Sequence, residues 1–326
     1  MRRRQVIASL GAAALSGLFK PAGAQAPARK TWRLGYLAPA SIPHLLDAFK
    51  KGLHDLGYVE GQNLMIEYRF GEGPVQIFDK LAASLVQLAP DVIVTVATPA
   101  TIAAKRATNT IPIVVATAGD LVGNGIVQSL SRPGGNVTGT TLYGLELSQK
   151  RLEVLKEAVP SVKQVTVLGN SDNVYNLRIW EDTVPAATVL GLRVVAVMVP
   201  GTAGLDHSFE DIRKTRPDAL IVLSDASFNA ARQQITRLAA EHRLPTMYEA
   251  REFVEAGGLI SYGPNIAQMS YRAAAFVDKV LKGSRPADLP VEQPSAFELC
   301  INMRSARALG LTIPPTLLAR ADELIE

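Results

Sequence analysis

Short apolar runs recur along the chain from residue 33 onward, and each is bounded by turn residues. They are rich in Val and Ile and do not alternate with polar residues, which is typical of strands buried on both faces of a sheet. The pattern predicts strands over residues 33–38, 63–70, 91–97, 111–118, 164–170, 192–199, 218–225 and 244–249, with a shorter run at 259–262.

The stretches between these runs carry apolar residues at helical spacing, so that each stretch has one apolar face. The clearest stripes are Phe78, Leu81, Leu85 and Leu88, and then Met269, Ala273, Phe276 and Val280. Strands and helices in strict alternation predict parallel sheets connected by right-handed crossovers.

The alternation is interrupted by the turn-rich segment "RPGGN" and by residues 137–144, which we interpret as a crossing between two lobes. The sequence thus predicts an α/β fold of two Rossmann-like lobes, each a parallel sheet flanked by helices, joined by a hinge of several crossings. We expect lobe 1 to hold residues 31–141 and 264–292, and lobe 2 to hold residues 142–263 and 293–326. Two lobes on such a hinge would form a clamp.

The C-terminal tail is long enough to cross between the lobes twice more. Its pattern predicts a helix over residues 264–282, a proline-rich link over 285–294, a strand over 295–302 and a last helix from about residue 315.

The first 24 residues have the features of a secretory signal peptide. Three arginines (Arg2, Arg3 and Arg4) precede an uncharged run over residues 6–19, and small residues follow, so we expect cleavage after Ala24. The start "RRRQVI" also resembles a twin-arginine export signal, and the Sec route stays open. The alternative is a short, uncleaved membrane anchor, although the apolar run is shorter than the roughly 20 residues of a membrane span.

The net charge comes from this N-terminal segment. The chain has 34 Lys and Arg against 30 Asp and Glu, and residues 1–24 hold four of the basic residues and no acidic one, which leaves 30 against 30. No basic run appears further on, so a nucleic acid partner is not expected.

Cys300 is the only cysteine, so the chain cannot form an internal disulfide. Its apolar surroundings, "FELCINM", are typical of a small buried side chain. Because no cysteine follows the apolar run of the signal, a lipid anchor is not expected either. We therefore expect a globular protein, exported to the periplasm of a two-membrane bacterium and without a lipid anchor.

Ligands of open parallel sheets bind beyond the carboxyl ends of the strands. The residues at these positions are small, polar or aromatic. The candidate ligand-binding residues are Ser41, Thr98, Asp120, Tyr143, Asn170, Ser171, Asp225, Tyr248, Glu249 and Tyr262.

Thr98 and Pro99 are typical of a helix start, with Thr98 as the N-cap and Pro99 at the first helical position. The free N–H groups of that helix end would suit a carboxylate or another small anion. Capping without any ligand is the alternative.

Asp120 and Asp225 each follow a buried strand, one in each predicted lobe. Either could hold a ligand ammonium group. The alternatives are an N-cap for the next helix or a salt bridge at the hinge.

Four tyrosines lie near the predicted strand ends and could enclose an aromatic or apolar ligand body. They are Tyr143, Tyr175, Tyr248 and Tyr262. The alternative is that they pack the hinge with their hydroxyl groups in water.

The glycine-rich turn "ATAGDLVGNG" (116–125) raises the possibility of a nucleotide site. It lacks the third small residue of G-x-G-x-x-G, and the chain has no G-x-x-x-x-G-K-[ST]. We interpret Gly119, Gly123 and Gly125 as allowing a tight exit from the sheet, and we expect no cofactor.

Catalytic motifs are also missing from the sequence. It has no G-x-S-x-G and no H-E-x-x-H, and its four histidines are scattered (His44, His54, His207 and His242). We expect no metal site and a protein that binds without catalysis.

Several long segments resemble a known family. They are "IPIVVATAGDLVGNGIVQSLSRPGGNVTG" (111–139), "REFVEAGGLISYGPN" (251–265), "RPADLPVEQP" (285–294) and "INMRSARALGLTIPPTLLARADELIE" (301–326). They are similar to the ABC transporter substrate-binding proteins that include tryptophan- and tyrosine-binding members.

The resemblance implies a type I periplasmic-binding-protein fold with three crossings, and a ligand that is trapped on closure and delivered to a membrane permease. It further implies that Thr98 and the amides after it take a carboxylate, and that Asp225 or Asp120 takes an amine. Family members often have proline after these aspartates, whereas this chain has Leu121 and Ala226.

Together these inferences predict a monomeric binding protein for a small amphipathic solute, with an aromatic amino acid as the first choice. Two alternatives remain at this point: a sensor component that presents its ligand to a membrane receptor, and an exported α/β enzyme.

Overall fold

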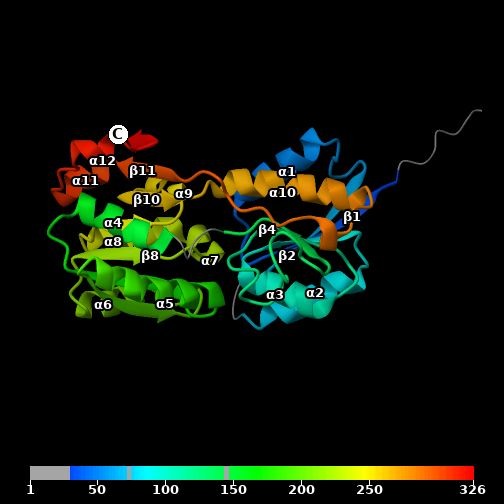
Figure 1. Ribbon diagram of the computed structural model, residues 1–326, viewed down its shortest axis with the longest axis horizontal. Coiled ribbons are helices and arrows are strands. Elements are labelled where there is room, and N and C mark those ends of the chain that lie inside the picture. The colour runs from blue at the N-terminus through cyan, green and yellow to red at the C-terminus, as the bar shows by residue number, and fades with distance from the viewer. Residues whose placement is uncertain (1–29, 72–74, 143–146) are drawn as a thin grey trace, which may run out of the picture. The chain divides into compact units, whose positions relative to one another are not determined.

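The structure is a computed structural model that describes residues 30–71, 75–142 and 147–326. Residues 31–326 form one compact unit built on two β-sheets (Figure 1). The predicted signal peptide and Tyr143 lie outside the described residues. None of the helices within the described ranges has the length and apolar character needed to cross a membrane.

The first sheet has five strands in the order β2-β1-β3-β4-β5, and all neighbouring strands run parallel. Its strands are β1 (Trp32–Ala38), β2 (Leu64–Phe70), β3 (Val92–Val96), β4 (Ile113–Thr117) and β5 (Val137–Gly139). The helices that pack on it are α1 (Pro43–Asp55), α2 (Ile77–Gln87), α3 (Thr98–Ala107) and α10 (Ile266–Leu281).

Both faces of this sheet are buried, which explains the unbroken apolar runs. Tyr36 packs with Phe49 of α1 and Phe276 of α10 on one face. Its neighbour Leu37 points to the opposite face and packs with Phe78 of α2. Figure 1 shows α1 and α10 side by side on one face, and α2 and α3 on the other.

The second sheet has seven strands in the order β12-β11-β10-β9-β8-β6-β7. Its strands are β6 (Gln164–Asn170), β7 (Arg193–Val199), β8 (Ala219–Val222), β9 (Thr246–Tyr248), β10 (Ile260–Gly263), β11 (Glu298–Asn302) and β12 (Glu323–Ile325). The helices that follow or connect them are α4 (Ser148–Ala158), α5 (Val174–Val189), α6 (Leu205–Lys214), α7 (Ala226–Ala230), α8 (Arg232–Glu241), α9 (Arg251–Glu255), α11 (Met303–Leu309) and α12 (Pro315–Leu318).

The second sheet is also covered on both faces. Val167 packs with Leu152 of α4 and Ile179 of α5. Its neighbour Leu168 packs with Phe209 of α6 on the opposite face. Two sheets of this kind confirm the predicted α/β fold, and the eight long apolar runs are confirmed as strands.

The sequence predicts that residues 137–144 only cross between the lobes, and the structure differs from this prediction. Residues 137–139 form β5, which pairs with β4. Gly139 makes this pairing possible, because a Cβ at its position would lie only 2.2 Å from Val115 O.

The tail differs in two ways. First, β11 runs antiparallel to β10, whereas parallel sheets were predicted. The chain leaves the second sheet at the carboxyl end of β10, forms α10 on the first sheet, and then returns. The chain re-enters the second sheet at the same end at which it left. The next strand, β11, must therefore run in the direction opposite to β10.

Second, the predicted last helix is short. It covers only Pro315–Leu318 and is followed by β12, while α11 was not predicted. β12 pairs in parallel with β11 and so occupies an edge that would otherwise expose unpaired backbone groups.

Segments that connect the two sheets hydrogen-bond to each other. Thr141 N donates to Glu292 O (2.9 Å), and Glu292 N donates to Gly139 O (2.9 Å). A third connection, residues 264–265, leads from β10 into α10. The boundaries of the two lobes within this arrangement stay predictions.

Candidate functional site

Strand ends from both sheets line one cavity, here called the inner cavity. Its walls come from the ends of β3, β4 and β8, from the start of α5, and from apolar residues near α1 and α10. It is lined by Ile42, Leu45, Val96, Ala97, Thr98, Thr117, Ala118, Gly119, Leu142, Asn173, Tyr175, Ser224, Asp225, Ala226, Asn229 and Ile266. Its empty volume is about 460 Å³, which includes space open to solvent.

A second, outer cavity meets the inner one at Asp225. Prolines and small residues form most of its wall, and Asn170, Asp172 and Ser227 supply polar groups. Its empty volume is about 1560 Å³ and includes space open to solvent. The two cavities together are called the crevice below. The crevice lies at the carboxyl ends of the strands, where ligand sites of parallel sheets are expected.

Thr98 lies in the inner cavity, but it is not the N-cap of α3 as predicted. Ala97 takes that position, with a φ of 72° that is rare for a residue other than glycine. The Thr98 hydroxyl instead accepts from Gly119 N (3.0 Å) and donates to Gly119 O (3.2 Å). Thr98 therefore ties the start of α3 to the end of β4, and the N-terminal end of α3 still faces the cavity.

Gly119 and Tyr175 form the contact between β4 and α5 in the inner cavity. The Tyr175 ring is buried, and a Cβ on Gly119 would lie 2.1 Å from ring atom Cδ2. The first glycine of the glycine-rich turn is thus required by the close approach of a ring. Gly125 has a φ of 64°, a left-handed backbone conformation that favours glycine.

Asp225 caps helix α7, which was one of the two alternatives for this residue. Its Oδ1 accepts from Ser227 N (2.9 Å), Phe228 N (3.2 Å) and the Ser227 hydroxyl. Its Oδ2 accepts from Asn173 Nδ2 (2.9 Å). A carboxylate oxygen offers two lone pairs, so Oδ2 can accept one further hydrogen bond from a group in the cavity.

Asn229 lies one helical turn after Asp225 and also lines the inner cavity. Its side chain is buried, and no described residue donates a hydrogen bond to its Oδ1. Buried amide oxygens are nearly always paired in folded proteins. Asn229 Oδ1 is therefore a candidate acceptor for a hydrogen bond from a ligand.

Asp120 forms a salt bridge, which was the alternative to its binding a ligand ammonium group. Its Oδ2 pairs with Arg178 of α5, and its Oδ1 accepts from Gly123 N (2.8 Å). Arg178 also donates to Gly123 O (2.8 Å). Asp120 lines neither cavity. Its carboxylate therefore joins the turn after β4 to a helix of the second sheet.

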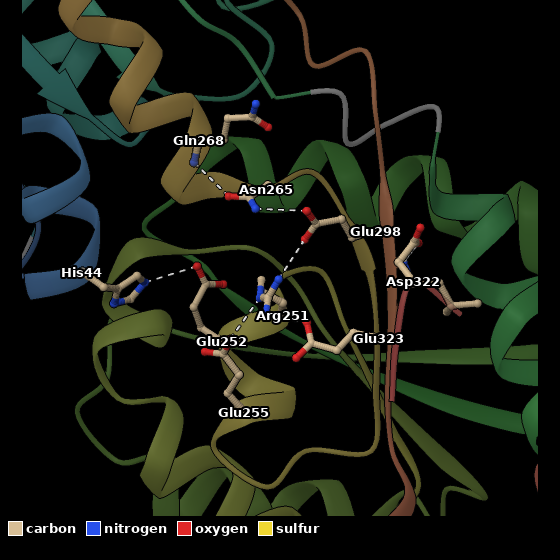
Figure 2. Close-up of polar contacts among 10 residues, drawn as sticks. His44, Arg251, Glu252, Glu255, Asn265, Gln268, Glu298, Asp322 and Glu323 are labelled. Carbon is tan, nitrogen blue, oxygen red and sulfur yellow. Dashed lines mark hydrogen bonds and ion pairs between the residues drawn. The ribbon is translucent and has the colours of Figure 1, made fainter. Parts of the chain in front are cut away.

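A second polar contact joins helices of the two sheets. Figure 2 shows His44 of α1 directed toward Glu252 of α9, with 3.2 Å between Nε2 and Oε1. In the same view Arg251 lies between acidic side chains and pairs with Glu323 (2.6 Å) and Glu298 (3.5 Å).

Glu249, one of the candidate ligand-binding residues, is part of a buried ion pair and lines neither cavity. Its Oε2 lies 3.2 Å from Arg151 Nη2, and the side chains are 4% and 2% exposed. Arg151 Nε also donates to Tyr262 O (3.0 Å). Burial raises the pKa of the Glu249 carboxyl, and the Arg151 guanidinium opposes that rise.

Asn170 lines the outer cavity, and its side chain connects the turns at Asp172 and Gly201. Its Oδ1 accepts from Asp172 N (3.0 Å) and from Gly201 N (2.9 Å). Ser171 is partly buried and lies outside both cavity walls.

Three further candidates lie outside the crevice walls. Ser41 is exposed. The Tyr262 ring packs against Phe297, with 6.2 Å between centroids. Tyr248 is fully buried, stacks on Phe253 and lines a different cavity. The structure thus brings together Thr98 and Asp225 in the inner cavity, with Asn170 nearby in the outer one.

Sequence reasoning missed Asn173 and Asn229. A signal for Asn229 was present, because a residue four positions after an N-cap aspartate lies on the same side of the helix. Asn173 follows β6 by three residues, and its capping of α5 through Tyr175 N (3.1 Å) is also a local pattern.

The described part of the chain has no group of three or more His, Cys, Asp and Glu side chains that could hold a metal ion. Cys300 is buried, and burial raises the pKa of its thiol to about 11.

Two helix-flanked sheets whose strand ends line a shared crevice define the type I periplasmic binding proteins. Solved leucine-binding and other periplasmic binding proteins have this fold at only 12–14% identity, which is a likeness in fold alone. Sequence comparison then identifies the family. The model for "ABC transporter substrate binding protein" matches residues 38–325, and this chain belongs to that family.

Relatives within this family cover most of the chain. A tyrosine-binding protein of Clostridioides difficile is 28% identical over 272 residues, which are 83% of this chain and 78% of that protein. A Streptococcus pneumoniae domain solved in complex with L-Trp is 29% identical, with a TM-score of 0.82 over 91% of this chain and 100% of that one. A conserved domain protein of Vibrio cholerae is 31% identical, with a TM-score of 0.84 over 90% of this chain and 100% of that one.

Proposed function

We propose that this protein binds an amphipathic amino acid in the crevice, with aromatic amino acids as the first candidates, and delivers it to an ABC permease in the inner membrane. It would do so as a monomer in the periplasm after removal of residues 1–24. The observation that carries the proposal is the convergence of three features on one cavity: the N-terminal end of α3, the Asp225 carboxylate and the unpaired Asn229 oxygen.

The N-terminal end of α3 suits the ligand carboxylate. The N–H groups of Thr98 and Ala100 have no acceptor among the described residues, and Pro99 has no N–H to offer. Unpaired N–H groups and the positive end of the helix dipole stabilise an anion at this position.

Asp225 and Asn229 suit the ligand ammonium group. Asp225 Oδ2 has room for one more hydrogen bond, and Asn229 Oδ1 has no donor within the described residues. An ammonium group has three donors and needs several acceptors when it is buried. These two oxygens belong to the second sheet, whereas α3 belongs to the first.

Apolar side chains near these polar groups suit the body of the ligand. They are Ile42, Leu45, Leu142, Tyr175 and Ile266. An aromatic side chain can stack on or pack against such a wall. The two relatives, one named for tyrosine and one solved with L-Trp, support an aromatic amino acid as the first candidate.

Placing the carboxylate and ammonium partners on different sheets explains how binding can drive closure. A ligand shifts a conformational equilibrium only by its differential affinity for the two states. An amino acid that bridges α3 and Asp225 stabilises the arrangement in which the two sheets approach each other, which is the form expected to engage a permease.

A thermal-shift screen against amino acids, their deaminated acids, sugars and nucleotides tests the proposal. A ligand at 100 times its Kd stabilises the protein by roughly 2.7 kcal/mol. We expect the largest shift from an amino acid. A shift from sugars or nucleotides alone would contradict the proposal.

A further inference from the structure

Asp225 is a buried carboxylate that has no cationic partner within the part of the chain that the structure describes. Two other buried acidic side chains each face a basic one. Glu249 pairs with Arg151, and Glu252 Oε1 lies 3.2 Å from His44 Nε2. The hydrogen bonds to Asp225 come from neutral donors instead. Because burying a charge is unfavourable unless it is paired, Asp225 favours a cationic group supplied by a ligand.

The two oxygens of this carboxylate are held differently. Oδ1 accepts from Ser227 N (2.9 Å) and Phe228 N (3.2 Å) at the start of α7, and also from the Ser227 hydroxyl. Oδ2 receives one donor from the described residues, Asn173 Nδ2 at 2.9 Å. Torsion about the Cβ–Cγ bond of aspartate has broad minima, so the direction of Oδ2 depends on this one hydrogen bond.

The Asn173 side chain is itself fixed. Asn173 is 3% exposed and is the N-cap of α5, where its Oδ1 accepts from Tyr175 N (3.1 Å). An amide offers an acceptor at one end and a donor at the other. With the oxygen used by the helix cap, the nitrogen is directed at Asp225 Oδ2. Asn173 thus connects the start of α5 to the end of β8 in the wall of the inner cavity.

We propose that Asn173 is the positioning residue for the ligand ammonium group. It orients Asp225 so that the remaining lone pair of Oδ2 faces the amine of a ligand in the inner cavity. This inference rests on the proposed function, since it takes Asp225 as the partner of the ammonium group. Asn173 acts through Asp225 and determines how strongly the crevice prefers an amino acid over the same molecule without its amine.

The variant Asn173→Ser tests this role without removing the helix cap. Serine is about as good an N-cap as asparagine, but it has no amide nitrogen. Calorimetric titration gives the Kd of tryptophan and of its deaminated analogue, indole-3-propionate. The preference for tryptophan should fall about fivefold, the effect of one hydrogen bond, while the Kd of indole-3-propionate stays unchanged. Asn173→Thr removes the same donor and serves as the second variant if the first does not fold.

Asn302→Ser is the matched control, because Asn302 is also a buried N-cap asparagine. Its Oδ1 accepts from Ser305 N (3.0 Å), and its Nδ2 donates to Val254 O (3.1 Å). Asn302 is 5% exposed and lines neither cavity of the crevice. The control variant loses the same atoms at an equally buried helix start, and its preference for tryptophan should equal that of the wild type.

A double-mutant cycle shows whether Asn173 acts through Asp225. In the Asp225→Asn background, Asn173→Ser should not change the preference any further. A preference that survives Asn173→Ser, that falls equally in Asn302→Ser, or that falls again in the Asp225→Asn background would overturn this inference alone. A wild type with no preference for tryptophan would instead contradict the proposed function, and this inference with it.

Discussion

The ring of Tyr175 occupies the space that a side chain on Gly119 would need, with 2.1 Å from ring atom Cδ2 to the position of a Cβ. Gly119 follows a strand of the first sheet, and Tyr175 belongs to a helix of the second. Gly119→Ala should therefore oppose the approach of the two sheets and cost about 1–3 kcal/mol. We expect a loss of ligand affinity of about tenfold or more, measured by calorimetric titration.

Gly125→Asn is the control within the same turn. Gly125 has a positive φ and no atom within 4 Å of a Cβ position, and asparagine tolerates that backbone conformation. Ligand affinity should stay unchanged in this variant. Equal affinities of the Gly119→Ala protein and the wild type would mean that the contact between Gly119 and Tyr175 plays no part in binding.

Asn229→Ala tests whether Asn229 contributes to ligand binding or to the stability of the fold. Because no described residue donates to Asn229 Oδ1, its removal should change the free energy of unfolding by less than about 0.5 kcal/mol. Binding should weaken about fivefold, the effect of one lost hydrogen bond of about 1 kcal/mol. Denaturant melts and titrations on the same preparation measure both quantities. A large loss of stability with unchanged binding would assign Asn229 to the protein core instead.

The Asp120–Arg178 ion pair should stabilise the contact between the two sheets only slightly. Arg178 is 41% exposed, so solvent screens the pair and its coupling should be about 0.5–1 kcal/mol. A double-mutant cycle of Asp120→Asn and Arg178→Gln, with ligand affinity as the readout, measures this coupling. Strictly additive effects would show that the pair does not contribute to the bound form.

The Arg151–Glu249 pair predicts a pH dependence of stability. Burial raises the folded-state pKa of Glu249 above its ordinary value of 4.5, so the folded state binds a proton more readily than the unfolded state. The free energy of unfolding therefore falls as pH rises from 4.5 through the raised pKa. Arg151→Met should raise that pKa further and deepen the fall, while Glu249→Gln should remove it.

Melting temperatures between about pH 4.5 and 7.5 for the wild type and both variants test this sign. The quantity to compare is the melting temperature of each variant minus that of the wild type at the same pH. Other groups titrate equally in all three proteins, so their contribution cancels in this difference. An Arg151→Met protein that gains stability with rising pH relative to the wild type would contradict this account of the pair.

Local patterns in the sequence were sufficient for the strands, the main helices and the position of the crevice. Buried parallel strands leave unbroken apolar runs, and the carboxyl-end rule then placed Thr98 and Asp225 at a cavity that the structure contains. Both residues have additional structural roles. Thr98 exchanges hydrogen bonds with Gly119, and Asp225 caps α7.

Long-range partners determine where two of the candidate ligand-binding residues lie. Asp120 pairs with Arg178, 58 residues later in the chain. Glu249 pairs with a buried arginine that lies about a hundred residues earlier. No periodicity connects such residues, because the contact depends on how two separate helices and strands pack. The short edge strand β12 was missed for the same reason, since only its pairing with β11 defines it.

The most direct test of the central claim compares tryptophan with indole-3-propionate, which has the same ring and carboxylate and lacks the amine. In the wild type, tryptophan should bind about 10–100-fold more tightly, since hydrogen bonds to charged groups contribute about 1.5–3 kcal/mol. In Asp225→Asn the two affinities should become nearly equal. An unchanged ratio in Asp225→Asn, or tighter binding of indole-3-propionate to the wild type, would contradict the assignment of Asp225 to the ligand ammonium group.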